Sequence, residues 1–116
     1  MNTTISVMIY CDDCRLEAWA EWDAMPRIGE RVILWSPDGE TPLAFPVDGV
    51  EHDPRVGVVT VHLRNWSPAI AAAHGPARQF LEAVRDDMIK HVEDDEPREH
   101  WRPMRLHVAG EMVWEG

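Results

Sequence analysis

Cys11 and Cys14 form the sharpest chemical motif in the sequence, with two aspartates between the thiols. This spacing can bring two thiolates to one metal ion or make a redox pair. A redox role needs positive charge or a helix N-terminus to lower the thiol pKa, whereas Asp12 and Asp13 act in the opposite direction. As metal ligands, the cysteines would supply half of a usual four-ligand structural zinc site. The motif therefore indicates either half of a zinc site or two ordinary reduced cysteines.

Histidines would have to complete such a site, because the sequence holds no second cysteine pair. The candidates are His52, His62 and His107. His62 and His107 are each expected on the polar face of a strand, so they would meet if their strands were neighbours. The sequence contains no glycine-rich phosphate loop, nucleophile elbow or HExxH segment. It therefore predicts no catalytic residue and no cofactor apart from this zinc alternative.

Acidic residues define a second candidate site. The chain has 21 acidic and 11 basic residues, a net charge of −10. Residues 1–53 hold eleven acidic and three basic residues, and residues 86–99 have a balance of −5. Nucleic-acid binding needs a basic stripe that neutralises phosphates, and the sequence has none. The charge therefore argues against direct contact with nucleic acid or an anionic membrane, and it indicates a protein partner with a basic surface.

Tryptophans could anchor such a partner, and the chain has six of them. Exposed indoles in loops often anchor protein interfaces. Four tryptophans fall in predicted loops or connections, where they anchor a partner or plug the ends of a small barrel: Trp19, Trp22, Trp66 and Trp101. Trp35 and Trp114 fall in predicted strands and are expected in the core or at a barrel mouth.

The predicted partner-binding residues combine two tryptophans with the acids near the end of the main helix. They are Trp19, Trp22, Asp86, Asp87, Glu93, Asp94, Asp95 and Glu96. The alternative is that these acids only solvate the end of that helix.

Short segments with the alternation of strands must position these residues. Ile5, Val7 and Ile9 alternate with other side chains, which is typical of a strand with one buried face. Further strands are predicted at 31–35, 44–47, 56–64, 104–108 and 112–114, the last two as a C-terminal β-hairpin. Residues 12–23 remain open between a short helix and a loop that covers the core.

Two irregularities are expected in the strand around residue 45. Asp48 and Gly49 interrupt the period of two between Val47 and Val50, which predicts a β-bulge. Prolines at positions 42 and 46 indicate that the same strand lies partly at a sheet edge.

Helices are predicted in the second half of the chain. Ser67 and Pro68 form a helix start, with serine as the N-cap and proline at the first position. Gly75 and Pro76 interrupt this helix, and the main helix runs from about 76 to 92 with an apolar stripe. The acidic residues that follow are unfavourable at a helix C-terminus, so the main helix should fray there.

Short strands, tight turns, one bulge and a late helix together predict an α+β protein with a small curled antiparallel sheet. Segments 26–32 and 47–52 resemble those of small SH3-like β-barrels of bacteria and phages. The resemblance covers residues 5–64 and implies a fold rather than an activity. Residues 1–116 are expected to form a single domain.

A non-catalytic acidic protein-binding module is the function that these features favour. Its more specific form is a phage or mobile-element inhibitor that occupies a basic surface of a nucleic-acid-handling protein. The alternatives are a structural or assembly component, for example of a virion, and a small zinc- or ligand-binding enzyme that uses Cys11, Cys14 and histidines. Absence of a signal-like or bilayer-spanning apolar run in the sequence predicts a cytoplasmic location.

Overall fold

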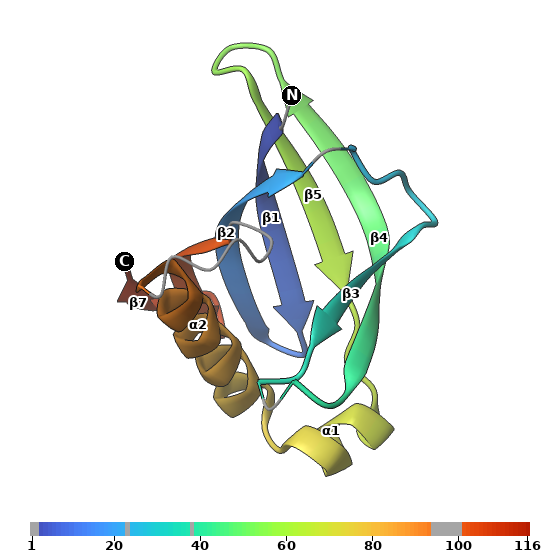
Figure 1. The fold of residues 1–116 in the computed structure, drawn as a ribbon, viewed down its shortest axis with the longest axis vertical. Coiled ribbons are helices and arrows are strands. Elements are labelled where there is room, and N and C mark those ends of the chain that lie inside the picture. Colours follow the sequence, from blue (N-terminus) through green and yellow to red (C-terminus); the bar gives the residue numbers. More distant parts are fainter. Residues whose placement is uncertain (1–2, 23, 38, 94–100) are drawn as a thin grey trace.

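The structure, a computed structural model, describes residues 3–22, 24–37, 39–93 and 101–116. This part of the chain contains strands and helices, which confirms the predicted α+β class. In chain order they are β1 (Thr3–Cys11), β2 (Cys14–Trp22), β3 (Arg31–Trp35), β4 (Pro42–Asp53), β5 (Val58–Arg64), α1 (Pro68–His74), α2 (Ala77–Glu93), β6 (Arg102–Val108) and β7 (Glu111–Glu115), as labelled in Figure 1.

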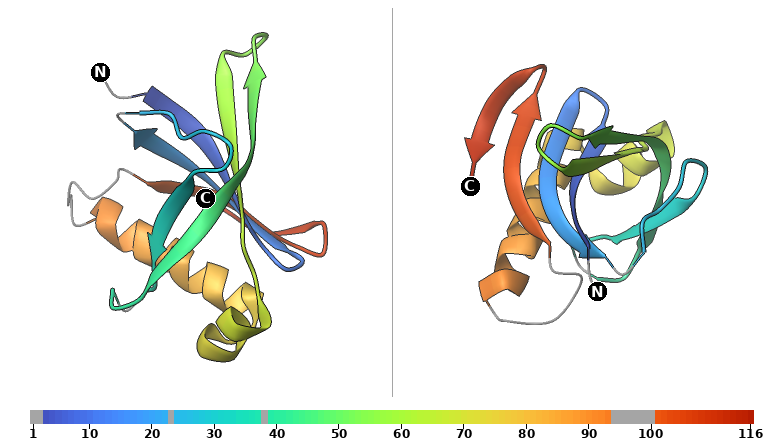
Figure 2. Two further views of the ribbon diagram at one scale, coloured as in Figure 1. Left: turned by 90° about the vertical axis from the view of Figure 1, so that its right-hand side faces the viewer. Right: turned by 90° about the horizontal axis from the view of Figure 1, so that it is seen from above.

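The strands form one curled, seven-stranded sheet in the order β3-β4-β5-β1-β2-β6-β7, which closes about half of a barrel (Figure 2). The prediction of an antiparallel sheet is wrong for one pair of strands, because β1 and β5 run parallel with Val7 opposite Val61. Turn signals predict antiparallel pairs of consecutive strands, but β1 and β5 are separated in the chain by three other strands. Their pairing depends on the tertiary fold. The sheet is therefore mixed, with parallel and antiparallel pairs.

β2 resolves the open segment 12–23 as a strand. It pairs with β1 along its whole length, from Cys11 opposite Cys14 to Thr3 opposite Trp22. Asp12 makes the turn between them with a φ of 53°, a left-handed conformation that aspartate tolerates better than most residues. The helical spacing of the apolar residues does not produce a helix, because a strand here supplies β1 with a hydrogen-bonded neighbour.

β4 changes its partner half-way along its length. Residues 42–46 pair with β3, and residues from Val47 onward pair with β5. The register shifts between Val47 and Gly49, which confirms the predicted bulge. The bulge lies where the strand passes from one neighbour to the other.

Pro42 and Pro46 lie in the half of β4 that pairs with β3, opposite Trp35 and Arg31. This half has one neighbouring strand among the described pairings. The prolines therefore occur where β4 is partly an edge strand, as the sequence predicts.

The helices begin close to where the sequence predicts. The Ser67 hydroxyl accepts a hydrogen bond from the Ile70 N–H at 3.2 Å, and Gly75 ends α1 with a φ of 78°. α2 spans Ala77–Glu93, close to the predicted range of 76–92.

One hydrophobic core lies between the inner face of the sheet and α2. The sheet contributes side chains that are 0% exposed, among them Val7, Leu16, Phe45 and Leu63. The predicted apolar stripe of α2 is confirmed at Phe80, Leu81, Val84 and Met88, while the Val92 side chain lies outside the described part of the structure. Within this part, neither helix has the length and apolar character needed to cross a membrane.

Leu81 tests the packing of α2 on the sheet. Its side chain is 0% exposed, so Leu81→Ala should lower the free energy of unfolding by about 3 kcal/mol through lost burial and a residual cavity. Gln79→Ala, at an exposed position of the same helix, should change it by less than about 0.5 kcal/mol. Urea unfolding of both variants measures the difference, and equal effects would contradict this packing.

Candidate functional site

The second face of the sheet, which we call the outer face, points away from the core. Its central side chains alternate with core residues along their strands and are half-buried or exposed: Ser6, Met8, Tyr10, Arg15, Glu17, Trp19, Thr60, His62, Arg64 and Arg105. The strand register aligns them in rows across the sheet, such as His62, Met8, Glu17 and Arg105. α2 packs on the inner face, on the other side of these strands (Figure 2).

Tyr10 is held in the middle of the outer face by two neighbours. Its hydroxyl lies 2.9 Å from His62 Nδ1, and the two rings stack with centroids 5.7 Å apart. The guanidinium of Arg64 lies 4.3 Å from the centre of the same tyrosine ring. A cation over an aromatic face is attracted by the ring quadrupole, so Tyr10 is fixed from two sides.

His62 and Arg64 are in turn held by carboxylates of β4. His62 Nε2 bonds to the carboxylate of Glu51, and Arg64 Nε lies 3.3 Å from Asp48 Oδ2. When Nε2 donates to Glu51, Nδ1 has a lone pair to accept the proton of the Tyr10 hydroxyl. Tyrosine, histidine and glutamate then form one directed hydrogen-bonded chain.

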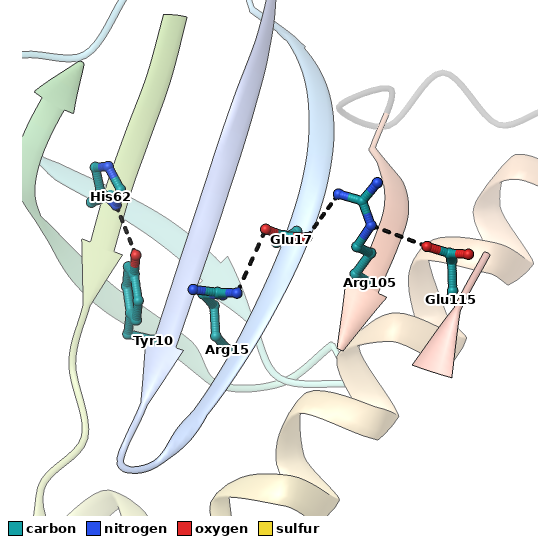
Figure 3. A network of polar contacts seen from close by, with 6 residues as sticks. All are labelled: Tyr10, Arg15, Glu17, His62, Arg105 and Glu115. Atoms are coloured by element: carbon teal, nitrogen blue, oxygen red, sulfur yellow. Dashed lines mark hydrogen bonds and ion pairs between the residues drawn. The ribbon is translucent and has the colours of Figure 1, made fainter. Parts of the chain in front are cut away.

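A second network crosses β2, β6 and β7 and contains alternating charges (Figure 3). Glu17 lies between two arginines, with Arg15 Nη2 at 3.8 Å and Arg105 Nη1 at 3.4 Å. Arg105 Nε also donates to Glu115 at 3.1 Å. Hydrogen bonds to Glu115 and Glu17 raise the pKa of Arg105 above its ordinary value. The outer face is therefore a mosaic of mutually paired charges and not a uniformly acidic surface.

The outer face brings aromatic rings and charged side chains into contact with one another. His62 bonds to both Tyr10 and Glu51. Paired side chains of this kind lose little further freedom on contact with a partner. The outer face thus offers aromatic rings and charges in fixed positions.

Trp19 and Trp22 do not form the single surface that their spacing suggests. Trp19 lies half-buried on the outer face of β2. Trp22 packs against the core, and its ring meets that of Trp101 edge-on at 5.4 Å. A strand directs residues three apart to opposite faces, so the two tryptophans are separated by the sheet.

The predicted acidic residues also lie apart from Trp19. Asp86 is exposed on α2 beside Arg85, at 3.0 Å, and Asp87 is half-buried on the same helix. Because α2 packs on the inner face, Asp86 and Asp87 are on the other side of the sheet from Trp19. Glu93 is the last residue of α2, and its side chain is not described. The remaining three, Asp94, Asp95 and Glu96, lie outside the described residues.

Cys11 and Cys14 lie directly opposite one another at the closed end of the β1–β2 pair, both as free, buried thiols. The pKa of each thiol is raised to about 12, mainly by burial. For Cys14, Asp13 contributes to this rise by accepting a hydrogen bond from its Sγ at 3.3 Å. Both thiols are therefore protonated at neutral pH.

The histidines do not join the cysteines. β1 and β2 lie between β5 and β6, so His62 and His107 are not on neighbouring strands, contrary to the arrangement that would let them meet. His52 is exposed in β4. Within the described ranges, no three histidine, cysteine or acidic side chains are grouped to hold a metal ion.

An exposed apolar patch at the end of the sheet is not predicted from the sequence. Trp35, expected in the core or at a barrel mouth, is 52% exposed on β3, beside Ile33 at 42%. Alternation in β3 predicts one buried face but does not say which, and Val32 and Leu34 take the inner face. Trp114, the other strand tryptophan, is half-buried with Arg85 over its ring at 4.9 Å.

No family model matches the chain, and neither a curated protein nor a solved structure matches it.

Raised thiol pKa values predict a loss of stability above pH 9. Unfolded thiols titrate near 9.0, whereas folded Cys11 and Cys14 keep their protons up to about pH 12. Between these values the unfolded state loses protons that the folded state keeps, so the free energy of unfolding falls as the pH rises. Below pH 9 this contribution is constant. Urea unfolding between pH 8 and about pH 10.5 should show a smaller decline for the Cys11→Ala/Cys14→Ala variant than for the wild type, and identical profiles would assign the decline to other groups.

Proposed function

We propose that this chain is a non-catalytic protein-binding domain whose contact surface is the outer face of the sheet. The observation that carries the proposal is the composition of that face. Tyr10, Trp19, Met8 and the arginines of its networks belong to the residue types enriched at protein interfaces. Trp, Tyr and Arg are also the side chains that most often dominate binding energy.

The paired charges of the outer face favour a specific partner rather than a generally sticky surface. Ion pairs at 3.1 to 3.8 Å hold Arg15, Glu17 and Arg105 in place, and a partner must match this alternation of sign. Juxtaposed like charges penalise wrong partners and fix the register of the right one. The outer face therefore supports recognition by both shape and charge pattern.

The acidity of the whole chain supports a basic partner. Its net charge is −10, and exposed acids on the turns and strand ends include Asp12, Asp13, Glu21 and Asp53. The negative electrostatic field of these acids accelerates the encounter with a positively charged surface, while the outer face makes the contact. An inhibitor that occupies the basic surface of a nucleic-acid-handling protein is the specific form of this proposal.

The SH3-like resemblance of residues 5–64 stays a hypothesis within this proposal. Short strands and the bulge in β4 support it. The parallel pairing of β1 with β5 is a feature that the resemblance does not imply.

Trp19 and Trp22 provide a matched test of the contact surface, since they are three residues apart on opposite faces. A photo-crosslinking residue at position 6 of the full chain, directly opposite Trp19 on the outer face, identifies the bound protein, which is then purified for affinity measurements. Trp19→Ala should weaken its binding by about 30-fold, or 2 kcal/mol, with little loss of fold stability. Trp22→Ala should instead lower the free energy of unfolding by about 2 kcal/mol, because this ring packs on the core.

The outer-face proposal fails if Trp19→Ala binds the purified partner as tightly as the wild type. It also fails if Trp22→Ala, at a temperature where it remains folded, loses more affinity than Trp19→Ala.

The salt dependence of the association rate tests whether electrostatic attraction guides the chain to a basic partner. The association rate with the partner should fall by about tenfold between 50 and 300 mM salt if long-range attraction steers it. Reversing Asp94 and Asp95 to lysine should reduce the rate at low salt and flatten its salt dependence. A rate that ignores both salt and reversal would mean that these acids only solvate the chain.

A further inference from the structure

β3 ends the sheet and leaves one edge without a strand partner in the described part of the chain. The ladder with β4 is anchored by Val47 N–H donating to the Glu30 carbonyl and Ser36 N–H donating to the Thr41 carbonyl, each at 2.8 Å. Hydrogen-bonded and non-hydrogen-bonded residues alternate in an antiparallel pair. Even-numbered residues of β3 therefore face β4, and the N–H and C=O groups of Arg31, Ile33 and Trp35 face the free edge.

The same residues also present exposed side chains. Ile33 is 42% and Trp35 is 52% exposed, and Arg31 is exposed beside them. Proteins usually protect a free edge with charges, prolines on that strand, bulges or a covering element. β3 has no proline and no bulge in its ladder with β4, and its exposed apolar side chains adjoin backbone groups that no described strand pairs.

β7, the strand at the other edge of the sheet, is protected in these ways. It begins at Glu111 and ends at Glu115, and its register with β6 shifts between Leu106 and His107. If two copies of β7 paired about Val113, Glu111 would lie opposite Glu115 of the second copy, and like charges directly opposite are destabilising. The two edges are therefore not equivalent.

We propose that two copies of this chain associate through β3, in antiparallel pairing about a two-fold axis at Ile33. In this register Ile33 faces Ile33 of the second copy, and Arg31 faces Trp35. All outward-facing residues of both strands then lie opposite one another and exchange about six backbone hydrogen bonds, more than any shifted register allows.

Side-chain complementarity supports the second copy as the occupant. Arg31 lies across from the Trp35 indole at both ends of the pairing, an arrangement that allows a cation–π contact twice. Ile33 meets its own copy at the centre, an apolar cross-strand pair. Such an interface is isologous, so association stops at the dimer and joins two sheets edge to edge.

Sedimentation equilibrium of the full chain over a concentration series tests this inference. The wild type should have about twice the chain mass of 13.3 kDa at high micromolar concentration. Ile33→Lys places two ammonium groups opposite one another and should raise the dimer dissociation constant by more than about tenfold. Val113→Lys is the matched control, because Val113 is also 42% exposed in an edge strand, and it should leave the dimer intact.

A covalent trap gives a second readout that does not depend on weak affinity. Opposed residues of a hydrogen-bonded cross-strand pair have Cα atoms about 5.5 Å apart, within the range of a disulfide. Ile33→Cys should therefore form a disulfide-linked dimer on mild oxidation, and Val113→Cys should not. The native Cys11 and Cys14 are buried and do not compete.

Three results would overturn the inference. The first is a wild type that stays monomeric while Ile33→Cys fails to cross-link. The second is loss of the dimer in Val113→Lys but not in Ile33→Lys, and the third is a mass above that of the dimer, which indicates pairing of β3 with β7 or another open assembly. Trp19→Ala should retain the dimer, so failure of this inference is separable from failure of the outer-face proposal. Circular dichroism confirms that each variant is folded before its mass is interpreted.

Discussion

β1 has to be paired on both sides, and the rest of the fold follows from this constraint. Val7 and Ile9 are 0% exposed, so the backbone of this strand lies in the sheet interior, where unpaired polar groups are costly. A tight turn supplies β2 on one side. On the other side, β1 pairs in parallel with β5, which follows β3 and β4 in the chain. The half-barrel and the mixed character of the sheet both depend on this central strand.

The core uses one face of the sheet, and the other face points away from it. Side chains of α2 fill the inner face, while the outer face is organised by contacts among its own residues, such as Tyr10 with His62 and Glu17 with Arg105. Pairing of this kind satisfies many polar groups without a covering layer, although Arg15 Nε is buried without a hydrogen-bond partner. It gives the outer face fixed side-chain positions, and the free edge of β3 adds a separate surface with unpaired backbone.

The cysteine pair illustrates how position changes the meaning of a motif. Two thiols with two residues between them can serve a metal or a redox reaction, but here they fall on the inner face at the end of a strand pair. Burial keeps Cys11 and Cys14 protonated, with pKa values of about 12. In the folded chain both pack as small side chains within the hydrophobic core.

Local signals in the sequence determined the elements: the Ser67 cap, the bulge after Val47, the apolar stripe of α2 and most strands. They could not determine which strands separated in the chain pair, because the partner of β1 is chosen by the packing of the whole sheet. The core position that the sequence allowed for Trp35 is wrong, since alternation marks two faces without saying which is buried. The candidate surface was predictable only as residue types, including Trp19 and the arginines. Its assembly into rows across several strands required the tertiary register, which alone brings Tyr10 to His62 and Glu17 to Arg105.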